Sequence, residues 1–159
     1  MRKLLFVISV ALVFAALNYA IYEKEQVKAR GETVFLELAP VDPRSLMQGD
    51  YMRLRYAIEQ GHAEEAPAER GYMVVALDAA KVGTFNRFYT GGALAPNEKL
   101  LHYIRNYSQL QIVPDSFLFQ EGHAKFYEQA KYGVFRFADN GSHVLVGLAD
   151  AAMKEIRPE

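Results

Sequence analysis

The chain has 159 residues, of which 51% are apolar and 23% are charged, and this size and composition are typical of one folded domain. Its 18 basic and 19 acidic side chains give a net charge of -1, so the basic surface expected of a protein that binds nucleic acid is lacking. The absence of cysteine excludes disulfides, thiolate metal sites and cysteine nucleophiles. We therefore expect no nucleic acid partner, and nothing in the composition points to a cofactor.

The clearest feature is an uncharged apolar run over residues 4–22, directly after Arg2 and Lys3. At about 1.5 Å per residue this run reaches about 29 Å, close to the roughly 30 Å thickness of a bilayer's hydrocarbon core. A signal peptide has a shorter apolar region and a small-x-small cleavage site, which is not clear here. The sequence therefore favours a retained transmembrane helix that contacts the lipid bilayer through residues 4–22.

Charges on both sides of the apolar run bear on its orientation. Arg2 and Lys3 precede it, and Lys24, Lys28 and Arg30 follow it, so the positive-inside rule is almost balanced. The first pair lies directly against the apolar run, which favours a cytoplasmic N-terminus. We expect a single-pass membrane protein with the C-terminal domain outside the cytoplasm.

Beyond the span, residues 23–30 are good helix formers and Gly31 is a natural stop. The predicted division is therefore an anchor with a juxtamembrane helix over residues 1–30 and a β-rich domain over residues 31–159. Alternating apolar residues predict a strand over 32–41. A second and stronger alternation starts at Tyr51, with Met52, Leu54, Tyr56 and Ile58 on one face.

The rest of the chain is also mostly strand in its pattern. The predicted elements are an exposed loop over 60–70, strands over 72–77 and 84–90, one long or two shorter strands over 100–113, a short apolar run over 117–119, a helix of about three turns over 121–131, and a hairpin joining 134–139 to 142–148. Asn140 and Gly141 at its centre predict a type I′ turn. The fold class is therefore α+β: an N-terminal transmembrane helix followed by a β-rich, mainly antiparallel domain with one short helix.

The segment that opens the second alternation carries a recognisable motif. Gly49, Asp50, Tyr51, Leu54 and Tyr56 match the five defining positions of the GDYXXLXY signature. The chain resembles the bacterial GDYXXLXY family of uncharacterised membrane-anchored proteins, and flanking segments extend the likeness from the anchor almost to the C-terminus. The resemblance implies a place in the bacterial inner (cytoplasmic) membrane and an extracytoplasmic domain associated with a polytopic membrane protein. It brings no catalytic residues.

Residues of the signature alternate between two faces of one strand. Leu54 and Tyr56 share a face that is expected to be buried, whereas Tyr51, Arg53 and Arg55 have the opposite parity. The opposite face either packs within the domain or contacts a partner protein. This leaves a non-enzymatic subunit of a polytopic membrane protein as the first functional hypothesis.

A possible polar cluster provides the second hypothesis. Asp42, Arg44, Ser45 and Asp50 lie around two turns, where capping by Asp and Ser explains most of them, and Glu121 and His123 are candidates to join them. Neither Glu121-x-His123 nor His62-x-Glu64 completes a metal site. The alternative function is thus an envelope hydrolase or ligand-binding protein that uses this cluster. A fold resembling signal peptidase is a further alternative. It would be inactive, because a recognisable Ser-Lys pair is lacking.

Overall fold

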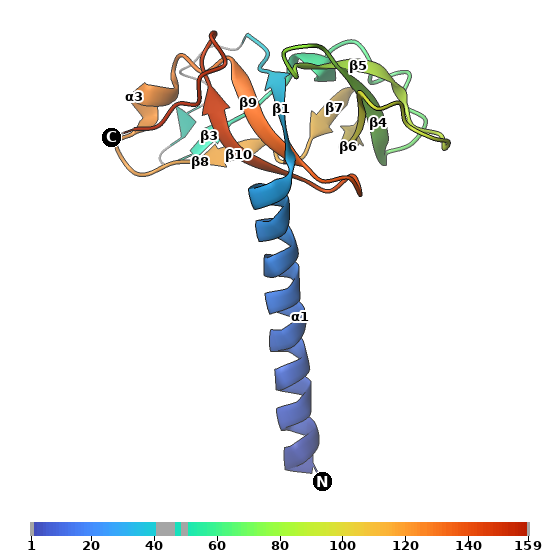
Figure 1. Cartoon of the computed structure of the whole chain (residues 1–159), viewed down its shortest axis with the longest axis vertical. Helices are drawn as coiled ribbons and strands as arrows, with labels where there is room; N and C mark the ends of the chain where they lie inside the picture. Colours follow the sequence, from blue (N-terminus) through green and yellow to red (C-terminus); the bar gives the residue numbers. More distant parts are fainter. Residues whose placement is uncertain (1, 41–46, 49–50, 159) are drawn as a thin grey trace.

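The structure is a computed structural model that describes residues 2–40, 47–48 and 51–158. A single long helix, α1, stands below a β-rich domain, and the chain's C-terminal end lies at the side of that domain (Figure 1). The described strands pair antiparallel, apart from one isolated parallel bridge, and one other short α-helix is present. The predicted α+β class is confirmed.

Helix α1 spans Arg2–Arg30, and the large apolar side chains of its residues 4–22 extend away from the domain. Ser9 and Asn18 within the run bond back to the preceding turn, Ser9 Oγ to the Leu5 carbonyl at 2.9 Å and Asn18 Nδ2 to the Phe14 carbonyl at 2.8 Å. These bonds lower the cost of placing the two side chains in lipid. The helix is long and apolar enough to cross a membrane, with a mean hydropathy of 2.4, properties that a signal sequence near the N-terminus shares.

The helix enters the domain without a linker. Gly31 N donates to the Val27 carbonyl at 2.8 Å, and β1 begins at the next residue. The space around Gly31 excludes a larger residue, because a Cβ there would lie 2.4 Å from the Val27 oxygen and 3.0 Å from the Phe137 oxygen. Val27 is buried against the domain, and Arg136 Nη1 donates to the Gly31 carbonyl at 3.2 Å. The orientation of the domain relative to α1 is therefore held by packing and hydrogen bonds.

The described part of the domain contains three small antiparallel sheets. The first, in the order β1-β9-β10, comprises β1 (Glu32–Glu37), β9 (Tyr132–Phe137) and β10 (His143–Ala149). The second, in the order β5-β4-β6-β7, comprises β4 (Arg70–Leu77), β5 (Gly83–Phe88), β6 (Glu98–Asn106) and β7 (Gln109–Ile112). The third, in the order β2-β3-β8, comprises β2 (Met47–Gln48), β3 (Tyr51–Arg53) and β8 (Ser116–Leu118). Two short helices complete the domain, the 3-10 helix η1 (Ala57–Glu59) and α3 (Ala124–Tyr127).

One hydrophobic core joins the sheets. It takes fully buried side chains from each of the two larger sheets, among them Leu36 from β1, Phe135 from β9, Val75 from β4 and Leu101 from β6. A parallel bridge between Phe35 and Val82 also links the two larger sheets. Burial of these apolar surfaces, at about 25 cal/mol per Å², is the main force that holds the sheets together.

The predicted helix over 121–131 is wrong in length, because α3 covers only Ala124–Tyr127. After Tyr127 the backbone turns toward the first sheet, where Lys131 N donates to the Ala149 carbonyl and Leu38 N donates to the Lys131 carbonyl, both at 2.8 Å. Tyr127 is buried, with its ring against those of Phe117 and Phe119. Tertiary hydrogen bonds thus replace the helical ones that local propensity predicted.

The hairpin of β9 and β10 is confirmed, but its predicted type I′ turn is wrong. That turn needs positive φ at both central residues, and of the two only Gly141 has it, at 83°. Gly141 N donates to the Ala138 carbonyl at 3.1 Å, and Ala138 N donates to the Ser142 carbonyl at 2.8 Å. The connection is therefore a three-residue loop over 139–141 with glycine in the left-handed position.

Two further segments also refine the expectations. Of the alternatives open for residues 100–113, the structure has two strands, β6 and β7, joined by a turn in which Tyr107 takes a φ of 52°. The segment over 60–70 is a loop, but Ala63 and Ala66 within it are buried in the core. Small apolar side chains let this loop lie close against the domain.

Candidate functional site

The signature segment begins as a strand and then leaves it. β3 pairs with β8 as far as Arg53, and Leu54 continues the same register by donating its backbone N–H to the Asp115 carbonyl at 2.7 Å. Tyr56 then bridges to Leu38, and η1 follows. The prediction of one continuous strand over 51–58 is therefore wrong, because its neighbours lie on separate sheets and the chain bends to reach each in turn.

The side-chain alternation persists through this bend. Met52, Leu54, Tyr56 and Ile58 are 4%, 2%, 0% and 7% exposed, so the predicted burial of Leu54 and Tyr56 is confirmed. The Tyr56 ring lies 5.7 Å from that of Phe135, and its hydroxyl donates to the Pro114 carbonyl at 3.0 Å. Tyr56 thus combines apolar burial with a satisfied hydroxyl, and burial raises its pKa well above the usual value.

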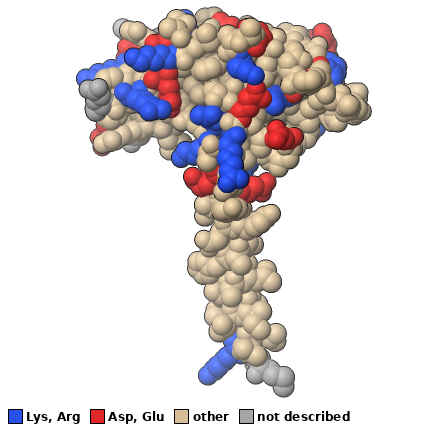
Figure 2. All heavy atoms as spheres, in the orientation of Figure 1, with Lys and Arg blue, Asp and Glu red and all other residues tan. Residues whose placement is uncertain are grey.

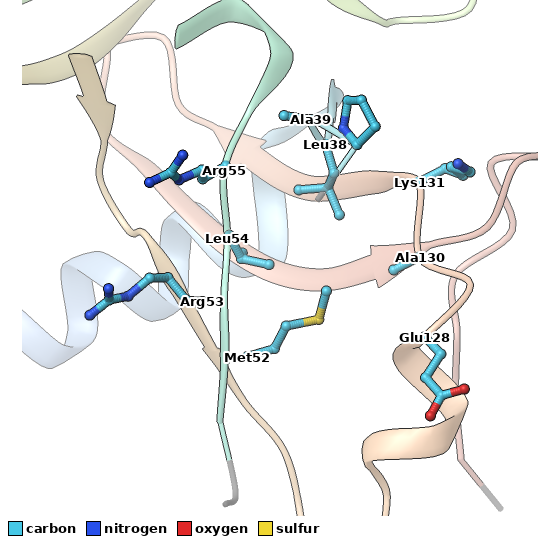
Figure 3. Close-up of a pocket in the computed structure, with 10 residues that line it drawn as sticks. Leu38, Ala39, Met52, Arg53, Leu54, Arg55, Glu128, Ala130 and Lys131 are labelled. Atoms are coloured by element: carbon cyan, nitrogen blue, oxygen red, sulfur yellow. The ribbon is translucent and has the colours of Figure 1, made fainter. Parts of the chain in front are cut away.

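Beside the signature lies a pocket of about 180 Å³. Figure 3 shows Met52 and Leu54 reaching into it, together with Leu38 and Ala130 from the opposite side. Glu128 and Lys131 also line it, and both carry a charged side chain. The pocket offers a mainly apolar floor with charges at its edge, which suits an apolar side chain or a small ligand.

The opposite face of the segment is cationic. Arg53 and Arg55 are exposed and extend together away from the apolar pocket (Figure 3), while Tyr51 is half-buried. Among the described residues, none forms an ion pair with either arginine. Both line a second pocket of about 220 Å³, where they meet Glu59 and Asp115.

That second pocket has an ordered polar wall. Asn106 Nδ2 donates to Gln111 Oε1 at 3.2 Å, and Gln111 Nε2 donates to Asp115 Oδ2 at 2.6 Å. The chain of hydrogen bonds fixes the Asp115 carboxylate near Arg53 and Arg55 without a direct ion pair to either. The arrangement can bind a polar partner that supplies both donors and acceptors.

Glu59 is the residue that the sequence analysis missed. It accepts hydrogen bonds from two backbone amides, Tyr56 N at 3.1 Å and Ile112 N at 2.7 Å. Burial nevertheless raises the pKa of its carboxyl to about 7, opposed by these hydrogen bonds and by Arg55. Tyr56 and Glu59 have the spacing of a capping box, a motif that marks the start of a helix. The sequence analysis missed it because the cap position normally carries Ser or Thr, and here it carries an aromatic residue.

The predicted polar cluster is only partly within the described structure. Asp42, Arg44 and Ser45, together with Gly49 and Asp50 of the signature, lie outside the described residues. Glu121 is exposed in the turn before α3, and His123 is half-buried with its ring edge-on to Phe126 at 5.5 Å. Nothing described brings these two side chains to an acid or base partner.

Metal ligation finds no support among the residues that the structure describes, where no group of three His, Asp or Glu side chains could hold an ion. His62 stacks on Phe85 with 3.9 Å between ring centroids, and its Nδ1 lies 3.8 Å from a Glu65 carboxylate oxygen. Glu64 lines a pocket with Glu59 and Arg55, and His62 is not among the residues that line it. The observed role of His62 is packing.

A comparison with protein families bears on the identity of this signature. The family model described as "GDYXXLXY protein" matches residues 13–148. The chain belongs to the GDYXXLXY family. The match begins within α1 and ends in β10, so it covers the second part of that helix and strands from every sheet of the GDYXXLXY domain. No curated protein and no solved structure matches the chain significantly.

Proposed function

We propose that this GDYXXLXY protein is a non-enzymatic accessory subunit, anchored in the bacterial inner membrane and bound to a polytopic membrane protein through its extracytoplasmic domain. The observation that carries the proposal is the direct junction of α1 with the domain. Because Gly31 is packed against both the helix and β9, the domain stays within a short distance of the bilayer. A domain held in this way meets partners that lie in the same membrane.

The face of Tyr51, Arg53 and Arg55 is the proposed contact surface. Arginine is enriched at protein interfaces, where its planar guanidinium binds carboxylates and carbonyls with defined geometry. In Figure 1, β3 and β8 lie in the half of the domain nearer to α1, within reach of a partner's extracytoplasmic loops. The complementary surface of the partner is expected to be acidic, since neither Arg53 nor Arg55 forms a direct ion pair among the described residues, although both line a pocket with Glu59 and Asp115.

Affinity capture of the full chain in mild detergent tests the proposal. Wild-type protein should retain a polytopic membrane protein, and Arg53→Ser combined with Arg55→Ser should lower its recovery at least about tenfold, as expected for two interface arginines that cost about 1 kcal/mol each. Arg70→Ser with Lys154→Ser is the matched control, because both side chains are exposed cations elsewhere on the domain. Equal recovery with both double variants would exclude this face as the interface.

Orientation and retention of the anchor can be measured on the same membrane-bound chain. A reporter that is active only in the cytoplasm, fused after the last residue, should be inactive, because Arg2 and Lys3 keep the N-terminus in the cytoplasm. The fusion should stay with the membrane after an alkaline wash and keep its full mass. Strong reporter activity would reverse the topology, and loss of about the first twenty residues would identify a signal peptide instead.

A further inference from the structure

A pocket next to α1 takes no part in the proposed partner contact. It has a volume of about 350 Å³ and is formed where the helix, the second sheet and the β9–β10 loop meet. Its lining comprises Lys24 of α1, Tyr72 of β4, Leu100 and His102 of β6, Val113 and Pro114, and residues 140–143. It therefore joins the anchor to parts of the domain that are distant in sequence.

The position of Lys24 sets the depth of this pocket relative to the bilayer. Lys24 lies two residues after Tyr22, the end of the uncharged run, which is about 3 Å along a helix. Headgroups occupy roughly 5–7 Å on each side of the hydrocarbon core, so Lys24 lies at headgroup level when the run spans the membrane. In Figure 1 the β9–β10 loop likewise lies on the side of the domain that faces α1, at the height of the helix end.

The charged and polar groups around the pocket suit an anion. Lys24 supplies an ammonium group and His102 a half-buried imidazole, and none of the residues lining the pocket is acidic. The nearby carboxylates of Glu23 and Asp139 line a separate pocket against α1. Figure 2 shows charged side chains of both signs gathered where the helix meets the domain, above a stretch of helix that has no charged side chain.

His143 also lines this pocket, but its ring is held by contacts within the domain. Its ring stacks on Phe137 with 5.0 Å between centroids, and its two nitrogens lie 3.3 Å and 3.2 Å from the carbonyl oxygens of Gly141 and Val113. Burial lowers the pKa of this imidazole, with Lys24 and His102 adding to the effect. His143 therefore supports the wall of the pocket, and Lys24 and His102 are the groups able to face a ligand.

Apolar surface adjoins the cationic groups. Tyr72 is 45% exposed and Val113 is 40% exposed, although both lie on the folded domain. The Tyr72 ring packs edge-on against His102 at 5.4 Å, so this exposed aromatic surface lies directly beside the imidazole. A ligand with a negative group next to an apolar body would use both surfaces, and such molecules are concentrated at this depth of a membrane.

We propose that this pocket binds the anionic headgroup of a phospholipid from the membrane in which α1 is anchored, with Lys24 and His102 facing the phosphate and Tyr72 and Val113 against the glycerol and upper acyl chains. Charge complementarity and the depth of Lys24 carry the assignment. The proposal requires the membrane anchor and does not require a protein partner, so it stands or falls separately from the accessory-subunit function.

The test uses the full chain in neutral detergent micelles, labelled with nitrogen-15 at its four histidines. Titration with dihexanoyl phosphatidylglycerol should shift the side-chain resonances of His102 and His143. The resonances of His62 and His123 should stay fixed, since neither lines the pocket. Dihexanoyl phosphatidylcholine should bind at least about tenfold more weakly, and inorganic phosphate at the same concentrations should give no shift.

Matched variants separate the pocket from general surface charge. Lys24→Gln should weaken binding of the glycerol lipid about fivefold, the effect of one basic residue at a membrane surface. Lys28→Gln removes the same charge one turn further along α1, outside the pocket, and should leave the affinity within about twofold. Both side chains are exposed, and circular dichroism should confirm unchanged folding.

Each contrary outcome overturns the proposal. Equal affinity for inorganic phosphate would make this a site for free anions rather than for lipid. Equal affinity for the choline lipid, or equal weakening by Lys24→Gln and Lys28→Gln, would exclude recognition of an anionic headgroup by the pocket. Unchanged His102 and His143 resonances throughout the titration would exclude binding at this place.

Discussion

Leu54→Ala should lower the free energy of unfolding of the domain by about 2–5 kcal/mol, the cost of emptying a packed leucine site. Leu54 is 2% exposed and lies between Met52 and Tyr56, in the core that joins the sheets. Its backbone amide is held by the Asp115 carbonyl, so the main chain cannot easily collapse into the cavity. We therefore expect a cost toward the upper part of that range.

Thermal or urea unfolding of the full chain in neutral detergent, followed by circular dichroism, measures this loss. Arg53→Ser is the matched control, because it alters the adjacent residue on the exposed face and should stay within about 0.5 kcal/mol of wild type. An unchanged melting temperature for Leu54→Ala would contradict the burial of the signature. Equal losses for both variants would show that the segment lacks distinct buried and exposed faces.

The free energy of unfolding should also fall as the pH rises from about 4.5 to about 7, because of Glu59. Burial raises the pKa of this carboxyl to about 7 in the folded protein, whereas it is close to 4.5 in the unfolded chain. The folded state therefore binds the proton more tightly, and its advantage is complete below pH 4.5 and lost as the pH passes 7. The contribution amounts to as much as about 3 kcal/mol at 1.36 kcal/mol per pH unit.

Glu59→Gln isolates this contribution, because the amide does not titrate. The difference in unfolding free energy between wild type and Glu59→Gln should change with pH in this window, whereas Glu64→Gln, at an exposed carboxyl of the following loop, should follow wild type. The comparison is needed because burial lowers the pKa of His143, which makes stability rise with pH over part of the same range. A difference that is constant between pH 4.5 and 7 would contradict the raised pKa.

Two fixed positions of the family signature lie on the buried face of the segment. Leu54 and Tyr56 are 2% and 0% exposed, while the positions that the signature leaves open include the exposed Arg53 and Arg55. Tyr51, which is also fixed, is half-buried on the opposite face. The signature therefore constrains residues on both sides of the segment in this chain.

Patterns of neighbouring residues were enough to predict the anchor, most strands and the two faces of the signature. An apolar run of bilayer length is helical because no other backbone arrangement satisfies its own hydrogen bonds in lipid. Alternation such as that of Leu54, Arg55 and Tyr56 places successive side chains on opposite sides of an extended backbone, even where strand pairing ends at Arg53. These features depend on residues close in sequence.

Tertiary contacts decided the features that local patterns did not predict. α3 ends at Tyr127 because Lys131 is drawn into pairing with Ala149, and the pKa of Glu59 rises because β7 and the signature segment enclose it. The pocket at Lys24 and His102 unites residues 78 positions apart, which no spacing in the sequence could indicate. Backbone hydrogen bonding, desolvation and shared pockets all depend on which distant segments become neighbours, and only the folded chain determines that.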